Sequence, residues 1–160
     1  MTEGEDIRIR RFRESDIEPL KQLVYATIDA CYSGVYPEEA VRFFKEWHSD
    51  KHIREDVSRG VILILETAGQ LVGTGTLVDD DIRRVFVAPD SQGRGYGEAI
   101  MSLLEERARA AGIAGVALSA SLPSKGFYDH LGYETLGEAS IDVGNGKTLD
   151  FYKMKKSLEA

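Results

Sequence analysis

The chain has 160 residues, of which 42% are hydrophobic and 29% charged, and this length suits one globular domain rather than two. Its 20 basic and 27 acidic side chains give a net charge of −7, without the positive excess that a general nucleic-acid binder needs to neutralise phosphates. We therefore expect a single domain over residues 1–160 and no nucleic-acid partner. A single cysteine forms no internal disulfide.

The sequence carries no sign of export or membrane insertion. Residues 1–10 are polar and acidic, without the apolar run of a signal peptide. The longest purely aliphatic run, residues 61–65, is far below the roughly 18 residues that suggest a membrane span. These features predict a cytoplasmic protein with no membrane segment.

The first third of the chain predicts one strand and at least two helices. Apolar residues alternate with arginines in residues 7–12, which indicates a half-buried strand. Ser15 is expected to cap a helix whose apolar residues recur at helical spacing over residues 17–28. Pro37 suits the first turn of a second helix, and a short polar helix or loop covers residues 52–57.

The middle of the chain alternates between strand and helix. Residues 61–66, 71–78 and 82–87 read as three strands joined by short turns, which predicts an antiparallel meander. Residues 94–111 predict a strong amphipathic helix that ends before a glycine. Residues 115–120 read as a buried strand. The helix between this strand and the strand at residues 82–87 is a long crossover, which predicts that the two strands run parallel.

The end of the chain adds a short helix over residues 124–131, a strand after Gly132 and a last strand over residues 149–155. The predicted fold is therefore α/β: a mixed, twisted sheet, with an antiparallel meander followed by a parallel strand, flanked by helices.

The most informative segment joins the strand at residues 85–87 to the helix that follows. It holds Gly93, Gly95 and Gly97, three glycines in five positions, immediately before helical spacing begins. The first N–H groups of a helix have no intrahelical partner, and glycines allow a ligand to approach this backbone closely. The arrangement suits the pyrophosphate of a nucleotide-containing ligand.

Two common phosphate-binding motifs do not fit this segment. A P-loop requires Lys-Ser or Lys-Thr after its last glycine, whereas Glu98 and Ala99 follow Gly97. The dinucleotide fingerprint requires a glycine at its sixth position, which is Glu98 when the motif is started at Gly93.

The segment from Gln92 to Gly97 resembles the Gln/Arg-x-x-Gly-x-Gly/Ala signature of the GNAT family of N-acetyltransferases, and the order of elements also follows that family. The resemblance implies acetyl-CoA or CoA as co-substrate, with no metal. The pantetheine arm would pair with the backbone of Val85 and Val87, and the amides of residues 93–97 would hold the pyrophosphate. The cofactor-binding residues implied in this way are Val85, Phe86, Val87, Gln92, Gly93, Arg94, Gly95, Tyr96, Gly97 and Ser124.

A second resemblance concerns the chemistry of the leaving group. Residues 127–133 look like the family's Phe-Tyr-x-x-x-Gly-Phe/Tyr segment, which makes Tyr128 the catalytic candidate that donates to the cofactor sulfur. A tyrosine with a pKa near 10 is a weaker acid than a thiol near 8.5, so we expect a hydrogen bond first and a late proton transfer. Many family members carry an asparagine where this chain has Ser121, and the backbone N–H of Val87 would stabilise the oxyanion.

The general base is left open by the sequence. The carboxylates of residues 79–81 and of Glu66 are candidates, and so is water. His48 and His52 titrate in a useful range and lie in the helical region that shapes the acceptor site in the resembling family. A surface position is the simpler expectation for both, and His130 is also expected to be exposed. Cys31 is expected to be a small buried residue rather than a nucleophile.

The predicted activity is N-acetyl transfer from acetyl-CoA to a primary amine by direct attack in a ternary complex. The alternative is a non-catalytic acyl-CoA binding or sensing domain, which would not depend on Tyr128. The acceptor is a small-molecule or peptide amine, and Tyr32, Tyr36, Trp47 and the acidic turns suggest a rim that suits a cationic one. The family resemblance is compatible with a homodimer.

Overall fold

Apolar side chains on both faces of the central strands require helices on both sides of the sheet. In the computed structural model, which describes residues 7–159, strand β2 (Val61–Thr67) directs Ile62 and Ile64 to one face and Leu63 and Leu65 to the other. The two pairs belong to two separate hydrophobic clusters. Residues 1–6 and residue 160 lie outside the described part of the chain. The expected domain range 1–160 is therefore described for residues 7–159.

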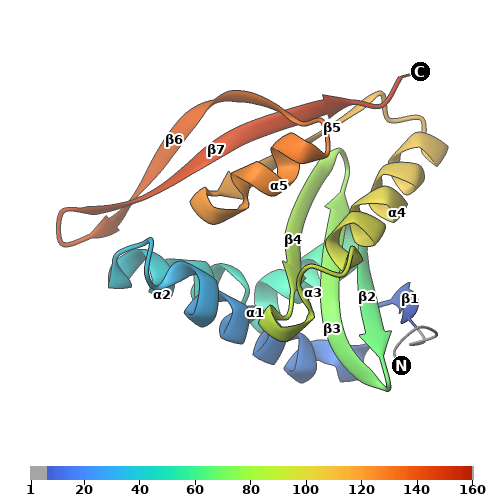
Figure 1. Cartoon of the computed structure of the whole chain (residues 1–160), viewed down its shortest axis with the longest axis horizontal. Coiled ribbons are helices and arrows are strands. Elements are labelled where there is room, and N and C mark those ends of the chain that lie inside the picture. The colour runs from blue at the N-terminus through green and yellow to red at the C-terminus, as the bar shows by residue number, and fades with distance from the viewer. Residues whose placement is uncertain (1–6, 160) are drawn as a thin grey trace.

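The strands form one sheet in the order β1-β2-β3-β4-β5-β7-β6 (Figure 1). Besides β2, the strands are β1 (Ile7–Arg11), β3 (Gln70–Val78), β4 (Asp81–Val87), β5 (Gly115–Ser121), β6 (Glu134–Gly144) and β7 (Lys147–Ser157). Strands β1 to β4 pair antiparallel, β4 and β5 pair parallel, and β7 pairs antiparallel with both β5 and β6. The prediction of a mixed sheet with a meander and one parallel step is confirmed, and the last strand, β7, lies between β5 and β6.

Helices cover the two faces unequally. The helices are α1 (Ile17–Tyr32), α2 (Glu38–Trp47), α3 (Asp50–Arg59), α4 (Tyr96–Ala110) and α5 (Lys125–His130), with short 3-10 turns at Glu14–Asp16, Pro89–Ser91 and Leu122–Ser124. The cluster with Ile62 and Ile64 also contains the buried residues of α1 to α3, and the cluster with Leu63 and Leu65 contains those of α4. The sheet is therefore the middle layer of three.

Two predicted helix starts are wrong by a few residues. Ser15 lies inside a 3-10 turn, and Asp16 holds the start of α1 instead: its carboxylate accepts from the backbone N–H of Arg13 at 2.7 Å and from Arg10 at 2.8 and 2.9 Å. Helix α4 begins at Tyr96 rather than at residue 94, because the backbone before it takes a left-handed conformation. The polar segment at residues 52–57 is a helix, α3, capped by Ser49.

The long hairpin of β6 and β7 extends over α2 (Figure 1). The hydroxyl of Tyr36 donates to the backbone oxygen of Asp150 at 2.7 Å and accepts from the N–H of Leu122 at 2.8 Å. Near the hairpin tip, Asn145 donates to Glu39 at 2.9 Å. The turn between α1 and α2 is thereby fastened to β7 and to the turn after β5.

Candidate active site

The site begins where two parallel strands separate. Strands β4 and β5 are paired only at Asp81 with Ala117 and at Ile82 with Leu118. Beyond this point β4 continues through Val87 without β5 beside it, so one edge of its backbone is open. Parallel strands that diverge in this way leave room for a ligand between them.

A β-bulge in β4 accompanies this separation. The register with β3 shifts between Thr74 and Thr76, and Arg84 has a left-handed backbone with φ 56°. Consecutive residues of a regular strand point to opposite faces, but the bulge directs both Arg83 and Arg84 toward Asp56 of α3. A non-glycine residue in this conformation costs on the order of 1–3 kcal/mol, and the contacts of the guanidinium offset that cost.

The backbone of Val87 faces the open edge. The N–H of Ala88 donates to Val72 of β3 at 2.8 Å, and strand alternation turns the polar groups of Val87 the other way. The Val87 oxygen accepts a hydrogen bond from Gln92 Nε2 at 3.0 Å. Gln92 therefore ties the glycine loop to the strand.

The glycine loop presents the start of α4. Gly93 and Gly95 have φ values of 81° and 83°, which L side chains rarely adopt. Gly95 is the N-cap and supplies no side-chain cap, so the first turn of α4 keeps N–H groups free for a ligand. A Cβ on Gly97 would lie 3.0 and 3.2 Å from the ring of Phe127, so this glycine allows α5 to approach α4.

A cavity of about 500 Å³ runs from this loop along the open edge of β4, and we name it the loop cavity. Nine of the ten residues expected to bind the cofactor line it: Val85, Phe86, Val87, Gln92, Gly93, Gly95, Tyr96, Gly97 and Ser124. Arg94, the tenth, is exposed and is not part of its wall. Cys31 lines this cavity and is half-buried, less buried than the sequence predicts.

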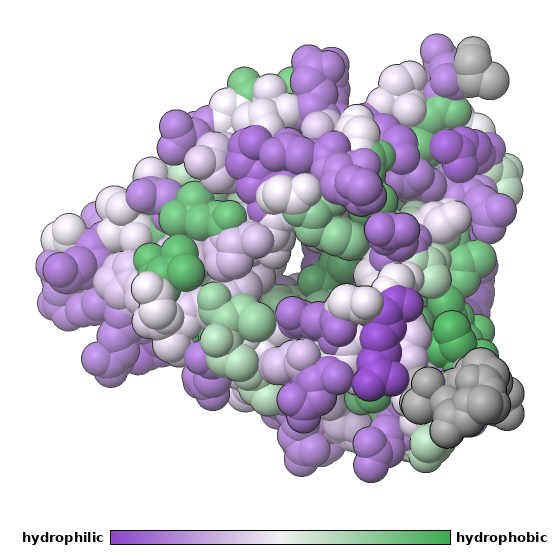
Figure 2. Space-filling model, viewed as in Figure 1, coloured by the Kyte–Doolittle hydropathy of each residue, from purple (hydrophilic) through white to green (hydrophobic). Residues whose placement is uncertain are grey.

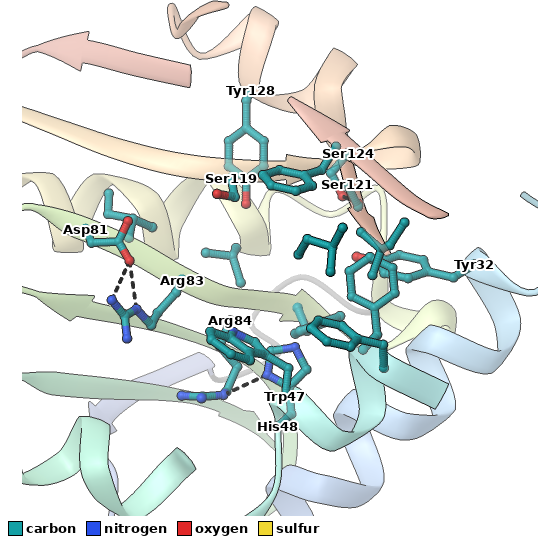
Figure 3. A pocket seen from close by; sticks show the side chains of 18 residues that line it. Tyr32, Trp47, His48, Asp81, Arg83, Arg84, Ser119, Ser121, Ser124 and Tyr128 are labelled. Atoms are coloured by element: carbon teal, nitrogen blue, oxygen red, sulfur yellow. Dashed lines mark hydrogen bonds and ion pairs between the residues drawn. The ribbon is translucent and has the colours of Figure 1, made fainter. Parts of the chain in front are cut away.

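A second cavity of about 240 Å³ lies between β4 and the hairpin, and we name it the aromatic cavity (Figure 3). Aromatic rings form much of its wall: Tyr32, Phe43, Phe44, Trp47, Phe86, Tyr128 and Phe151. The space-filling view shows the face of the molecule hollowed at its centre (Figure 2). Trp47 is 48% exposed and stacks on Phe43 with 6.2 Å between ring centroids.

The two cavities meet at five residues that line both: Tyr32, Val85, Phe86, Ser124 and Tyr128. Tyr128 is 7% exposed, and its hydroxyl points into the aromatic cavity (Figure 3). No group among residues 7–159 forms a hydrogen bond with that hydroxyl, while the ring packs on Phe127 and Tyr133 at centroid distances of 5.1 and 5.8 Å. Burial raises the pKa of Tyr128, so the hydroxyl remains a donor at neutral pH.

The serine that replaces an expected asparagine lies beside this junction. Ser121 and Ser124 share a hydrogen bond of 2.7 Å between their hydroxyls, and both line the aromatic cavity. Burial raises the pKa of the neighbouring Tyr32, and hydrogen bonds with these two serines partly offset the effect. The junction therefore carries three hydroxyl groups, from Tyr32, Tyr128 and Ser124, and that of Ser121 lies next to it.

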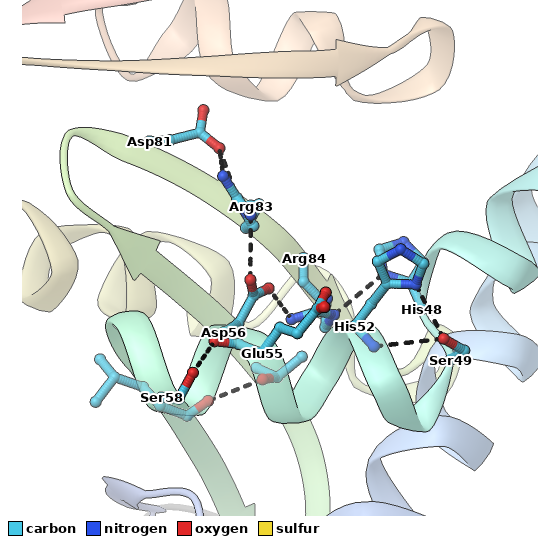
Figure 4. Close-up of polar contacts among 11 residues, drawn as sticks. His48, Ser49, His52, Glu55, Asp56, Ser58, Asp81, Arg83 and Arg84 are labelled. Atoms are coloured by element: carbon cyan, nitrogen blue, oxygen red, sulfur yellow. Dashed lines mark hydrogen bonds and ion pairs between the residues drawn. The ribbon is translucent and has the colours of Figure 1, made fainter.

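A buried charge network forms the floor of the aromatic cavity (Figure 4). Arg84 donates through Nη1 to Asp56 at 2.7 Å and through Nε to Nδ1 of His48 at 3.1 Å. Arg83 bridges Asp56 at 3.1 Å and Asp81 at 2.6 Å. His48 is 5% exposed, so the expectation of a surface histidine is wrong, and burial followed by the charge of Arg84 lowers its pKa well below the usual range.

Most other sequence candidates lie away from both cavities. Glu66 pairs with Arg10 at 3.2 Å, and neither Asp79 nor Asp80 lines a cavity. Within the described part of the chain, Asp81 is the one carboxylate in the wall of the aromatic cavity, and burial raises its pKa while Arg83 opposes the shift. His130 is exposed, as predicted.

Lys125 lies with its ammonium 2.7 Å from Asp129 and lines neither cavity. His52, which lies near Trp47, shares a hydrogen bond of 2.9 Å with Ser49 and also lines neither cavity. Between residues 7 and 159, no group of three His, Cys, Asp or Glu side chains is placed to hold a metal ion, and no helix is long and apolar enough to cross a membrane.

Comparisons with known proteins agree with this geometry. A family model described as an acetyltransferase (GNAT) domain matches residues 32–158, which include every residue that lines the aromatic cavity. An uncharacterised acetyltransferase of Streptococcus pyogenes serotype M3 is 29% identical over 101 residues, which cover 60% of this chain and 71% of that protein.

Solved structures share the whole fold. A GCN5-related N-acetyltransferase from Rhodopseudomonas palustris superposes with a TM-score of 0.85 at 25% identity, over 94% of both chains. The PaiA N-acetyltransferase of Thermoplasma acidophilum, solved in complex with coenzyme A, superposes with a TM-score of 0.71 at 20% identity, over 95% of this chain and 99% of that one.

Proposed function

The chain belongs to the GNAT family of acetyltransferases, and from that premise we propose that it transfers an acetyl group from acetyl-CoA to a primary amine by direct attack in a ternary complex. The observation that carries the proposal is the meeting of two cavities beside the hydroxyl of Tyr128. A donor in the loop cavity and an acceptor in the aromatic cavity would touch only there.

The loop cavity suits a long ligand with a phosphate at one end. The first turn of α4 receives the pyrophosphate, and the open edge of β4 pairs with the amides of the pantetheine arm. The thioester then reaches the junction. The oxyanion needs a backbone N–H at that point, and Val85, which lines both cavities, is better placed for this role than Val87, which lines only the loop cavity.

The reaction needs no covalent intermediate on the protein. The amine nitrogen attacks the thioester carbon, the C–N bond forms and the C–S bond breaks. One proton leaves the nitrogen, and one reaches the thiolate. Cys31 lines only the loop cavity and is absent from the junction, so it is poorly placed to carry the acetyl group between the two ligands.

Tyr128 is the proton donor to the thiolate, and Asp81 is the side chain best placed to receive a proton from the amine, directly or through water. A raised pKa makes the Asp81 carboxylate a stronger base than a free aspartate. A non-catalytic acyl-CoA sensor would have no need for a free hydroxyl at the meeting point of two cavities.

A thermal shift series with acetyl-CoA, CoA, ATP and NAD tests the first half of the proposal. A ligand at 100 times its dissociation constant stabilises the fold by about 2.7 kcal/mol. For a chain of this size the melting temperature then rises by roughly 5–10 °C. A shift with both CoA species, and none with ATP or NAD, supports the assignment; no shift with either CoA species overturns it. Thiol release on addition of amines then separates an enzyme from a sensor.

A further inference from the structure

The aromatic cavity contains a hydrogen-bond donor whose orientation is fixed by the protein. Nδ1 of His48 faces Nε of Arg84 at 3.1 Å. A guanidinium has donors only, so Nδ1 must accept, and the single proton of a neutral imidazole must then lie on Nε2. Burial and the adjacent guanidinium both lower the pKa of His48, which keeps the ring neutral.

This Nε2–H has no partner in the protein. Among the described residues no group forms a hydrogen bond with it, and it is not sealed from open space, although His48 is only 5% exposed. The space that His48 borders is the aromatic cavity (Figure 3). Nε2 therefore points a buried, unpaired donor at whatever occupies that cavity, and it is unsuited to be the general base.

The donor lies close to the reacting point. The ring of His48 meets the ring of Phe86 edge-on, with 5.3 Å between centroids, and Phe86 lines both cavities. An acceptor whose amine sits at the junction would reach Nε2 through only a few bonds. The group it places there must be a hydrogen-bond acceptor.

The charges around the cavity do not favour a polycation. Two guanidinium groups, Arg83 and Arg84, are matched by two carboxylates, Asp56 and Asp81. Every charged group of this network already has an opposite partner, so no surplus negative charge is left for a polyamine. The acidic turn that suggested a cationic acceptor contributes only Asp81 to the wall.

Most of the rest of the wall is apolar, although the side chains of Ser119, Ser121 and Ser124 also line it. Phe43, Phe44, Phe151, Ile141 and Leu149 line it, so the body of the acceptor is surrounded by rings and aliphatic side chains. The hairpin that supplies the last three is held down by the hydrogen bonds of Tyr36 and Asn145. A small ligand fits such a space of about 240 Å³ better than a folded protein surface does.

We propose that the acceptor is a small primary amine with an aromatic or apolar body and a carbonyl oxygen, of an amide or a carboxylate, a few bonds from the amine, and that Nε2 of His48 donates to this oxygen. The inference rests on the proposed acetyl transfer and specifies its acceptor. An amine without the oxygen would leave the buried donor unpaired.

Four amines test the inference in a thiol-release assay with acetyl-CoA: L-phenylalaninamide, L-phenylalanine, 2-phenylethylamine and spermidine. With concentrations expressed as free amine, we expect kcat/KM for a carbonyl-bearing amine to exceed that for 2-phenylethylamine by about tenfold. The comparison of the amide with the acid identifies the kind of oxygen. A preference for spermidine or for 2-phenylethylamine overturns the inference, and so does turnover of neither carbonyl-bearing amine.

Variants at position 48 separate recognition from folding. His48→Phe keeps a ring and removes the donor, so the ratio of kcat/KM for phenylalaninamide to kcat/KM for 2-phenylethylamine should fall to about one. The two amines differ in pKa, but this difference is the same for every variant and cancels when the ratios of two proteins are compared. His48→Gln retains a side-chain N–H donor and should recover part of the ratio, and it serves alone if the phenylalanine variant does not fold. His52→Phe is the matched control and should leave the ratio unchanged.

The ratio unchanged in a folded His48→Phe protein would overturn the role of His48. Failure of the wild-type protein to bind CoA in the thermal shift series is a different result, because it removes the proposed acetyl transfer itself. His48 lines only the aromatic cavity, so it is not among the residues that the binding test probes.

Discussion

Replacing Tyr128 by phenylalanine removes one hydroxyl and leaves the packing of the ring in place. The hydroxyl has no hydrogen-bond partner among residues 7–159, and the ring contacts with Phe127 and Tyr133 do not involve it. The free energy of unfolding should therefore change by less than about 0.5 kcal/mol, and the melting temperature by no more than about 2 °C.

The effect on turnover follows from the acidity of the two groups. General acid catalysis contributes about 10²- to 10⁴-fold. Because burial raises the pKa of Tyr128 further above that of a thiol, early proton transfer is unfavourable, and we expect the lower end of that range. A 100-fold loss in kcat corresponds to about 2.7 kcal/mol. The KM for acetyl-CoA should remain within about threefold, since the hydroxyl is needed only as negative charge develops on sulfur.

The assay is thiol release under saturating acetyl-CoA, with Tyr133→Phe as the matched control. The Tyr133 hydroxyl donates to the buried carboxylate of Glu105 at 2.7 Å and lies outside both cavities. Its loss should lower the melting temperature by several degrees, as expected for a hydrogen bond to a charged group, and leave kcat unchanged. An unaltered kcat in a folded Tyr128→Phe protein would refute the reasoning and direct attention to Tyr32, the other tyrosine at the junction.

Three further outcomes follow from the geometry. Arg84→Met should lower the free energy of unfolding by about 3 kcal/mol, because it leaves Asp56 buried with one of its two guanidinium partners; urea denaturation measures this, and a loss below 1 kcal/mol would contradict it. Gly75→Ala should cost about 1–3 kcal/mol, since the new Cβ would lie 2.5 Å from Ile100; an unchanged melting temperature would show that the core yields without strain. The hydrogen bonds from Arg10 hold the pKa of Asp16 below its ordinary 3.8. The stability that this pair gives is therefore present above pH 3.8 and is lost as the pH falls through the lowered pKa. Asp16→Asn should make the free energy of unfolding depend less on pH in that window, and identical acid-unfolding curves for the variant and the wild type would contradict the role of the pair.

Much of the fold could be predicted because local pattern and final structure agree. The apolar runs of the meander and the spacing of the helix after the glycine loop lie within single elements, and the structure places strands and a helix there. The position of β7 between β5 and β6 could not be predicted, because no local signal states which strand a distant segment will pair with. The start of α1 differs from the prediction for a similar reason. Arg10 of β1 donates a hydrogen bond to the carboxylate of Asp16, and this contact between separate elements has no local signal in the sequence.

The loop cavity could be anticipated residue by residue, whereas the floor of the aromatic cavity could not. Glycines, a strand and a helix start are consecutive in the sequence, so their spacing carries the information. Arg84 lies 36 residues from His48 and 28 from Asp56, and the bulge that joins them gives a non-glycine residue a left-handed backbone. Nothing in the local sequence distinguishes this buried arginine from the half-buried Arg83 beside it.

The divergence of β4 from β5 also sets a requirement on any ligand. Backbone N–H and C=O groups that lose a neighbouring strand still need hydrogen-bond partners. The Val87 oxygen has one in Gln92, and in the free protein solvent supplies partners for the other groups along this edge. A compact nucleotide would displace that hydration without replacing it. A linear chain whose own amides recur at strand spacing would replace each of those hydrogen bonds with one of its own. The open edge would therefore select a ligand by its shape even before a phosphate is bound. We therefore expect the two residue pairs that end the parallel ladder to favour a thread-like acyl carrier over a compact nucleotide.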